Sequence, residues 1–249
     1  MKNILNKIKI HPMFLVFMLI FILIGRFKFI LFFTLLILVH EFGHIIMSLL
    51  FKWNINKIVI LPFGGMIKYD KNINTSLMEE FLVAISGVIF QYIFYSIFKD
   101  IIYYKYFSFI NYFIIIFNLI PIYPLDGSKI LNVFFNIITT FKKSILLTLI
   151  VSYVLILILT FIFFDVNKLT VFIMYILFKE TTKLYNEKEA IFNKFLLERN
   201  LYEFKFKKKK TINSVDKMKK DYKHLFYKDG KYVTEKYYLK KMFDIQYKI

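Results

Sequence analysis

His40-Glu41-Phe42-Gly43-His44 interrupts a run, from Phe27 to Phe51, that is otherwise almost wholly apolar. On a helix the two histidines lie one turn apart on the same face, so both imidazoles can bind one Zn²⁺ ion. Glu41 stands beside them, where its carboxylate can polarise a metal-bound water. The pattern predicts a metal site inside a membrane-spanning helix.

Chance is a poor explanation for this motif. A chain of 249 residues with four His and nine Glu is expected to hold about 0.002 such matches. Ionisable groups at membrane depth cost roughly 2.5 to 3.5 kcal/mol each, so three of them within five residues indicate a function. A set of buried polar residues that only hydrogen-bond one another is the less favoured interpretation. The motif therefore predicts an intramembrane metalloprotease.

The composition predicts an integral membrane protein. Hydrophobic residues are 58% of the chain, and several apolar runs approach the roughly 20 residues that cross a bilayer. The predicted spans lie near residues 12–25, 27–51, 78–98, 106–141, 144–164 and 167–184. The expected fold class is an all-α polytopic membrane protein of about six transmembrane helices. The fourth helix is expected to be broken by Pro121 and Pro124.

Basic residues at the span ends set the expected orientation. They are denser before the first span, after the second and fourth spans and in the tail than in the alternate loops, so both termini are predicted to be cytoplasmic. We expect a six-span domain over 1–185 and a basic cytoplasmic tail over 186–249. Residues 201–249 hold fifteen Lys against six carboxylates. This charge favours the surface of the lipid bilayer over nucleic acid.

The tail also carries a signal for local structure. Asp229-Gly230 lies between two short β-prone runs, which is typical of a hairpin turn. Thr234 follows the second run and is able to cap a helix through Met242. The tail is therefore expected to contain a small hairpin and helix.

A catalytic zinc takes three protein ligands, and the third must come from outside the motif. The chain has no cysteine, so this ligand is His, Asp or Glu. Asp126 is the best candidate, because an ionised carboxylate within an apolar, proline-broken region needs a cation. The alternative role for Asp126 is a helix N-cap where the chain restarts. Asn118 precedes the break and can donate to a developing oxyanion, or simply bond to a neighbouring backbone group.

Two further regions are expected to flank this site. Residues 55–70 are rich in β-branched residues around Gly64-Gly65, which predicts a hairpin able to bind an extended peptide by strand addition. Ser86, Gly87 and Gln91 form a small-residue surface with one polar side chain in the third span. Close helix packing explains that surface at least as well as a place in the site.

These motifs together resemble the site-2 protease family of intramembrane zinc metalloproteases, and its sporulation group in particular. The match covers residues 1 to about 200 and includes Leu-Pro-Phe-Gly-Gly at 61–65 and Asn-Leu-Ile-Pro-Ile-Tyr-Pro-Leu-Asp-Gly at 118–127. The resemblance implies one zinc ion per chain, with the ligands His40, His44 and Asp126. It also implies that Glu41 is the catalytic acid and base and that Asn118 lies at the active site.

The resemblance implies a reaction and partners as well. A membrane-associated protein precursor is cleaved within or next to the membrane by zinc-activated water, and in the sporulation group this precursor is a sigma factor. Inhibitory membrane proteins restrain the enzymes of that group. The chain departs from the family at Val88, where relatives often carry Pro. Its tail is too short and too charged for the ATP-sensing domain of many sporulation-type members, so nucleotide control is not expected.

Two other functions use similar residues. A membrane metal transporter also places His, Glu and Asp at mid-depth, although the chain shows no inverted repeat. A catalytically inert membrane scaffold is the second alternative, but such a protein need not keep Glu41. The remaining histidines, His11 and His224, are expected to be solvated or interfacial and to have no part in catalysis.

Overall fold

The computed structural model describes residues 7–61, 64–102, 104–163, 168–204, 206, 208–228 and 230–246. The chain divides into two compact units, each built around its own apolar cluster. The first unit comprises Met1–Lys71, Phe81–Ile120 and Leu125–Gly127. The second comprises Asn72–Glu80, Pro121–Pro124 and Ser128–Ile249. All three predicted metal ligands belong to the first unit.

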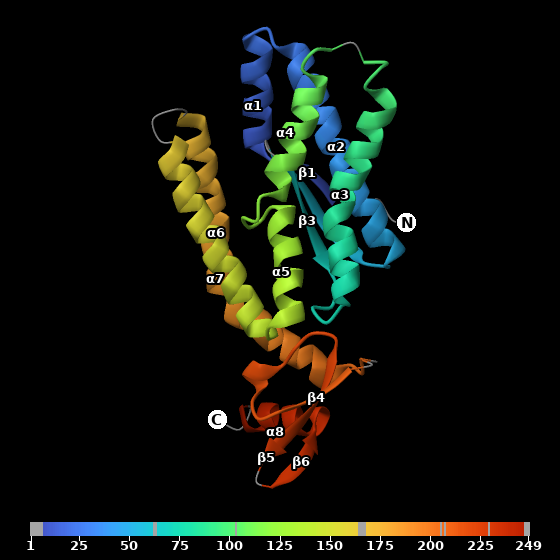
Figure 1. Ribbon diagram of the computed structural model, residues 1–249, viewed down its shortest axis with the longest axis vertical. Helices are drawn as coiled ribbons and strands as arrows, with labels where there is room; N and C mark the ends of the chain where they lie inside the picture. The colour runs from blue at the N-terminus through green and yellow to red at the C-terminus, as the bar shows by residue number, and fades with distance from the viewer. Residues whose placement is uncertain are drawn as a thin grey trace. The chain divides into compact units, whose positions relative to one another are not determined.

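The helices of the first unit pack around one buried stripe of α2. This unit contains α1 (Pro12–Leu23), α2 (Phe27–Leu50), α4 (Phe107–Leu119) and most of α3 (Leu77–Phe98). Helix α2 contacts both α1 and α4 (Figure 1). Its buried residues recur every three or four positions, from Ile30 through Phe33 and Ile37 to His40 and His44. The two histidines therefore continue the apolar stripe that α2 turns toward its neighbours.

A three-stranded sheet completes the first unit. Strand β2 (Asn54–Leu61) pairs antiparallel with β3 (Gly64–Asp70), which confirms the predicted hairpin. The turn residues Pro62 and Phe63 lie outside the described residues. The other edge of β2 pairs in parallel with β1 (Ile8–Ile10). This strand was not predicted, because three residues carry no periodic signal. The sheet order is β1-β2-β3, so β3 is an edge strand.

The second unit joins two long helices to the basic tail. It contains most of α5 (Asp126–Ile138), α6 (Phe141–Phe163) and α7 (Lys168–Leu201), and α6 packs along α7 (Figure 1). The tail forms β4 (Lys208–Ile212), a 3₁₀ turn (Val215–Lys217), β5 (Tyr222–Lys228), β6 (Lys231–Thr234) and α8 (Glu235–Gln246). The expected tail hairpin and helix are confirmed, while the predicted turn residue Asp229 lies outside the described residues. The strand β4, which pairs in parallel with β5, was not predicted.

Apolar side chains of the tail close the core of this unit. Phe226 of β5 and Leu239 of α8 are fully buried in a cluster with Phe141 of α6 and Phe195 of α7. The rings of Phe141 and Phe195 stack with their centroids 4.2 Å apart. The tail is thus a packed element of the second unit and not a freely solvated extension.

Three helices of the described residues are long and apolar enough to cross a membrane, namely α2, α3 and α6. Helices α1 and α4 are apolar but shorter. The fourth predicted span consists of two helices, since α4 ends at Leu119 and α5 begins at Asp126. A chain that is mostly helical agrees with the predicted fold class, although the described residues also include two three-stranded sheets. The count of six spans stays a prediction, as does the domain boundary at 185, through which α7 runs as one helix.

The prediction that His224 is solvated or interfacial is wrong, because its side chain is completely buried. Its Nε2 accepts a hydrogen bond from the Lys219 backbone N–H, at 3.1 Å, and its Nδ1 donates to Glu235, at 3.3 Å. The Arg199 guanidinium, also buried, donates to the Glu235 carboxylate at 3.0 Å. Burial lowers the pKa of His224, and the positive charge of Arg199 lowers it further. His11 is exposed and caps α1 by accepting from the Met13 N–H.

Asn74 and the tail both bind Arg199 of α7. The Asn74 side chain donates to Glu198, at 3.0 Å, and accepts from Arg199, at 2.7 Å. Arg199 also donates to the backbone carbonyls of Tyr222 and Lys219, at 2.7 and 3.0 Å. Buried charges that are fully hydrogen-bonded in this way are costly to separate. The network therefore fixes the tail to α7 and to the segment that leads into α3.

Acid should destabilise the folded chain through His224. Because its folded pKa is depressed, the unfolded chain takes up a proton below about pH 6.5 that the folded chain does not, so stability falls as pH falls. Glu235 acts in the same direction at lower pH. Burial raises its pKa, but the hydrogen bond from His224 and the charge of Arg199 outweigh this and lower it. One proton contributes a slope of at most about 1.4 kcal/mol per pH unit.

The measurement is thermal unfolding in detergent between about pH 7.5 and about pH 5.5, a window that lies above ordinary carboxylate pKa values. His224→Gln removes the titrating group and should flatten the pH dependence, although it lowers stability at neutral pH. An equal loss of stability toward acid in both proteins would contradict this assignment.

Candidate metal centre

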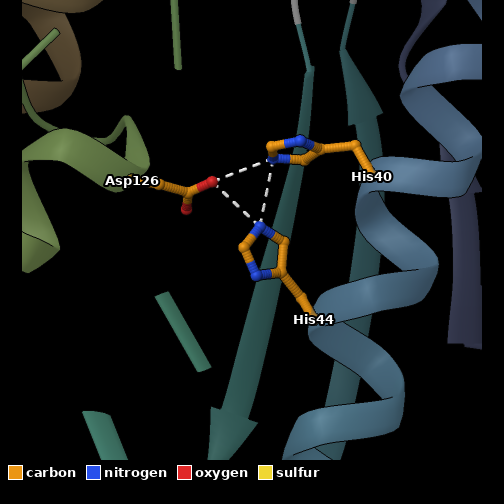
Figure 2. A group of neighbouring side chains, drawn as sticks. All are labelled: His40, His44 and Asp126. Atoms are coloured by element: carbon orange, nitrogen blue, oxygen red, sulfur yellow. Dashed lines mark hydrogen bonds and ion pairs between the residues drawn. The ribbon is translucent and has the colours of Figure 1, made fainter. Parts of the chain in front are cut away.

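Three side chains from two helices converge on one point (Figure 2). His40 and His44 project from α2, and Asp126 is the first residue of α5. The Nε2 atoms of His40 and His44 are 3.2 Å apart, and each lies 2.9 Å from Oδ2 of Asp126. The three residues are 1%, 4% and 4% exposed. The structure thus brings together all three residues that the sequence predicts as ligands.

The other ring nitrogen of each histidine binds an acceptor. Nδ1 of His44 lies 2.7 Å from the backbone carbonyl of Val83, which can only accept, so Nδ1 carries the proton. Nδ1 of His40 lies 3.0 Å from Oε1 of Gln91. A neutral imidazole that donates through Nδ1 presents a lone pair at Nε2. Two Nε2 lone pairs and a carboxylate oxygen therefore face one another, and a cation between them relieves their repulsion.

These atoms fit a zinc ion in both chemistry and spacing. Ligand atoms around a tetrahedral zinc, at about 2.0 to 2.1 Å from it, lie about 3.3 Å from one another. The distances of 2.9 to 3.2 Å approach that spacing. Two neutral imidazoles and one carboxylate are a donor set that catalytic zinc sites use, with one position left for water.

Helix α3 leaves room in front of the two nitrogens at Gly87. A methyl group added to Gly87 would lie 2.5 Å from Nε2 of His44 and 2.7 Å from Nε2 of His40. Helix α2 in turn approaches α3 at Gly43, where an added methyl would lie 2.6 Å from the Ser86 carbonyl oxygen. The space that a metal ion needs therefore depends on the absence of a side chain at Gly87.

Glu41 lies on α2 next to the cluster, with its carboxylate held by the hairpin. Its Oε1 accepts a hydrogen bond from the Gly65 backbone N–H at 2.7 Å, and the residue is 5% exposed. A methyl group on Gly65 would lie 2.3 Å from the Glu41 carboxyl carbon. A glycine at this place in β3 therefore lets the hairpin approach the carboxylate closely.

Backbone proximity also explains the Asp-Gly pair at the start of α5. An added methyl on Gly127 would lie 2.2 Å from the Leu119 carbonyl oxygen. Asp126 begins α5 at the point where that helix meets the C-terminal end of α4. Asn118, in the last turn of α4, is buried, and its Nδ2 donates to the Ile114 carbonyl at 3.0 Å. Its Oδ1 faces Gly64 of the hairpin, since a methyl there would lie 3.4 Å away.

The residues that orient the imidazoles were not predicted as part of the site. Val83 acts through its backbone carbonyl, which no sequence motif marks. Gln91 offered a signal, because a buried amide in an otherwise apolar span must find hydrogen-bonding partners. Close helix packing explained Gly87 at least as well as a place in the site. In the structure, Gly87 lies where α2 and α3 approach closely, and it also faces the ligating nitrogens.

The helices, the hairpin and the buried His-His-Asp cluster define a protein of the site-2 protease fold. The fold matches that of the site-2 protease from Methanocaldococcus jannaschii with a TM-score of 0.59 and 21% sequence identity, over 71% of this chain and 89% of that one. The chain also matches the model of peptidase family M50 over residues 28–105 and 98–162, together more than half of its length. The chain belongs to peptidase family M50, whose members are zinc metalloproteases.

A curated relative shows a similarity in sequence. The chain is 32% identical over 150 residues to stage IV sporulation protein FB of Bacillus subtilis (strain 168). This alignment covers 57% of the chain and 52% of the relative, so the chain spans about half the length of that protein.

Gly87→Ala should weaken zinc binding without unfolding the protein, because the added methyl occupies the space in front of both ligating nitrogens. We expect the zinc content after purification to fall well below one per chain. Metal analysis by mass spectrometry, together with chelator competition, measures this loss. Ile89→Ala, on the exposed face of the same helix, is the control and should keep the wild-type zinc content. Full zinc occupancy in Gly87→Ala would show that the ion does not lie against α3.

Proposed function

We propose that the chain is an intramembrane zinc metalloprotease that cleaves a membrane-associated protein. His40, His44 and Asp126 would hold one zinc ion, and Glu41 would serve as acid and base. The observation that carries this proposal is the meeting of three lone-pair atoms, 2.9 to 3.2 Å apart, two of which belong to the helix that also carries Glu41. Membership of peptidase family M50 supports the same reaction.

The side chains around the cluster have distinct tasks in a peptide hydrolysis. A bound zinc ion would supply Lewis-acid activation of water and of the peptide carbonyl. Glu41 accepts a proton from the attacking water and later delivers it to the leaving amine. The Gly65 N–H donates to the Glu41 carboxylate and fixes its position. Asn118 retains a second amide hydrogen, beyond the one donated to Ile114, that can stabilise negative charge on the carbonyl oxygen.

The edge of β3 is suited to bind the substrate as an added strand. Strand β1 covers one edge of the sheet, whereas β3 pairs only with β2 within the described residues. The Gly65 N–H of this strand already points to Glu41. A peptide in extended conformation along β3 would therefore pass the proton acceptor, and strand addition would hold it unwound for cleavage.

The substrate class follows from the similarity to stage IV sporulation protein FB. We take a sporulation sigma factor precursor, tethered to the membrane, as the substrate, and membrane proteins that inhibit cleavage as further partners. A bacterial cell membrane is the matching location. Six crossings with both termini in the cytoplasm agree with the basic residues at the span ends. Residues 186–249 would then face the cytoplasm as a region distinct from the six-span domain 1–185.

Glu41→Gln should abolish cleavage and keep zinc, because the amide preserves the shape of the side chain but cannot accept the proton. We expect the rate of precursor cleavage to fall by at least about 100-fold, in line with the loss of a general base. Cleavage in reconstituted membranes and zinc content are measured on the same preparation. Rapid cleavage by Glu41→Gln would contradict the mechanism. Zinc binding without cleavage by the wild type would favour a scaffold, and zinc flux across the membrane would favour a transporter.

The exposed lysines of the tail should hold it to an anionic bilayer. Lys231, Lys240 and Lys241 are exposed, and each contributes about 1 kcal/mol near such a surface. Replacing all three by Gln should therefore remove about 3 kcal/mol of attraction without exposing the buried core that deletion of the tail would open. The measurement is quenching of a tail fluorophore by headgroup-labelled lipid, in nanodiscs with and without anionic lipid.

A matched triple variant controls for the loss of charge alone. Lys28, Lys99 and Lys105 are also exposed but lie at the span ends predicted to face outside. Replacing these by Gln should leave quenching of the tail unchanged. Equal quenching in all three proteins would mean that the tail lysines do not bind the bilayer.

A further inference from the structure

A buried amide links the candidate metal ligand His40 to a third helix. Oε1 of Gln91, on α3, lies 3.0 Å from Nδ1 of His40. Nε2 of Gln91 donates to both the backbone carbonyl oxygen and Oδ1 of Asn111 on α4, each at 3.1 Å. The side chains of Gln91 and Asn111 are completely buried, and His40 is 1% exposed. Three helices, α2, α3 and α4, therefore meet in one line of hydrogen bonds.

Asn111 sets the orientation of the Gln91 amide. A backbone carbonyl has no hydrogen to donate, so the group of Gln91 that faces it must be the NH₂ group. The Gln91 oxygen then points to His40 and cannot donate. Nδ1 of His40 must provide the hydrogen for this contact, which leaves the lone pair of the neutral ring on Nε2. This is the nitrogen that lies 2.9 Å from Asp126.

The two histidines are oriented by different kinds of partner. For His44 the acceptor is the Val83 backbone carbonyl, which a side-chain substitution does not remove. For His40 the acceptor is a side chain, and that side chain is itself fixed by Asn111. Apolar surroundings strengthen the preference, because a buried N–H without an acceptor costs about 1 to 3 kcal/mol. The orientation of His40 is therefore open to test by mutation.

We propose that Gln91 is a positioning residue for metal binding: held by Asn111, it fixes the tautomer and ring orientation of His40 so that Nε2 is ready to bind the ion. This inference rests on the proposed function insofar as it takes His40 as a zinc ligand. It assigns a role to a residue whose position in the third span is otherwise explained by helix packing. Gln91 does not touch the reacting atoms and acts only through His40.

The test measures zinc affinity directly, so that it does not depend on cleavage. Gln91→Met keeps the volume of the side chain and removes both its acceptor and its donor. Chelator competition on the full-length protein in detergent should give a zinc affinity about 10- to 100-fold weaker than that of the wild type, the range found when a partner of a ligating histidine is lost. In the cobalt-loaded protein, the visible absorption bands should also shift, because His40 no longer holds one geometry.

Asn111→Ala should cause a smaller loss, since the Asn111 backbone carbonyl still accepts from Gln91. Because Asn111 acts on His40 only through Gln91, the double variant should lose no more affinity than Gln91→Met alone. Additive losses would overturn the proposed line of hydrogen bonds. Should Gln91→Met fail to accumulate, Gln91→Leu, which also removes both the acceptor and the donor, takes its place, and an unchanged affinity in that variant overturns the proposal.

Tyr95→Phe is the matched control. It removes another hydrogen bond between α3 and α4, from the Tyr95 hydroxyl to Ser108 at 2.9 Å, without touching a metal ligand. Its zinc affinity and cobalt spectrum should equal those of the wild type. A loss in Tyr95→Phe as large as that in Gln91→Met would show that any loosening of the two helices weakens the site, and this would overturn the role of Gln91.

The outcomes separate this inference from the proposed function. Wild-type protein that binds zinc but cleaves nothing refutes the protease, while the affinity ratio between Gln91→Met and wild type still judges the role of Gln91. Wild-type affinity in Gln91→Met refutes that role and leaves the protease intact.

Discussion

Mutual repulsion of three lone-pair atoms in an apolar interior is the constraint on which the first unit depends. Nε2 of His40, Nε2 of His44 and Oδ2 of Asp126 lie within 3.2 Å of one another and are almost completely buried. Such an arrangement costs free energy unless a cation balances it and other groups fix the rings. The α2 stripe, the start of α5 and the acceptors on α3 all supply that support.

Three glycines shape this site because they carry no side chain. Gly87 leaves space in front of the ligating nitrogens, Gly65 lets the hairpin reach Glu41, and Gly127 lets α5 begin against the end of α4. At each position an added methyl would lie within 2.7 Å of a functional group or of backbone. Two of these glycines therefore have distinct roles. Gly87 leaves room for the metal, and Gly65 sets the position of the proton acceptor Glu41.

Much of this arrangement could be predicted from the sequence because its signals are local. The spacing of the two histidines predicts that they share a helix face. The apolar runs predict the helices, and the β-branched run around Gly64-Gly65 predicts the hairpin. Asp126 could be predicted because a carboxylate in an apolar region requires a cation. The strands β1 and β4 could not, since each is short and is defined by its partner. The prediction that His224 is solvated was wrong because the lysines around it suggested a solvated tail. Its burial depends instead on contacts with Arg199 and Glu235, which are distant in the sequence.

The role of Gln91 shows why the ligand motif alone does not specify a working site. A His-x-x-x-His pair fixes which rings share a helix face, but leaves open which nitrogen of each ring carries the proton. That choice is made by α3, which supplies the Val83 carbonyl to His44 and the Gln91 amide to His40. Two side chains of the tail also contact the first turn of α3. Asp221 accepts a hydrogen bond from the Leu77 N–H, and Lys220 forms an ion pair with Glu80. One continuous helix therefore carries the contacts that orient both imidazoles.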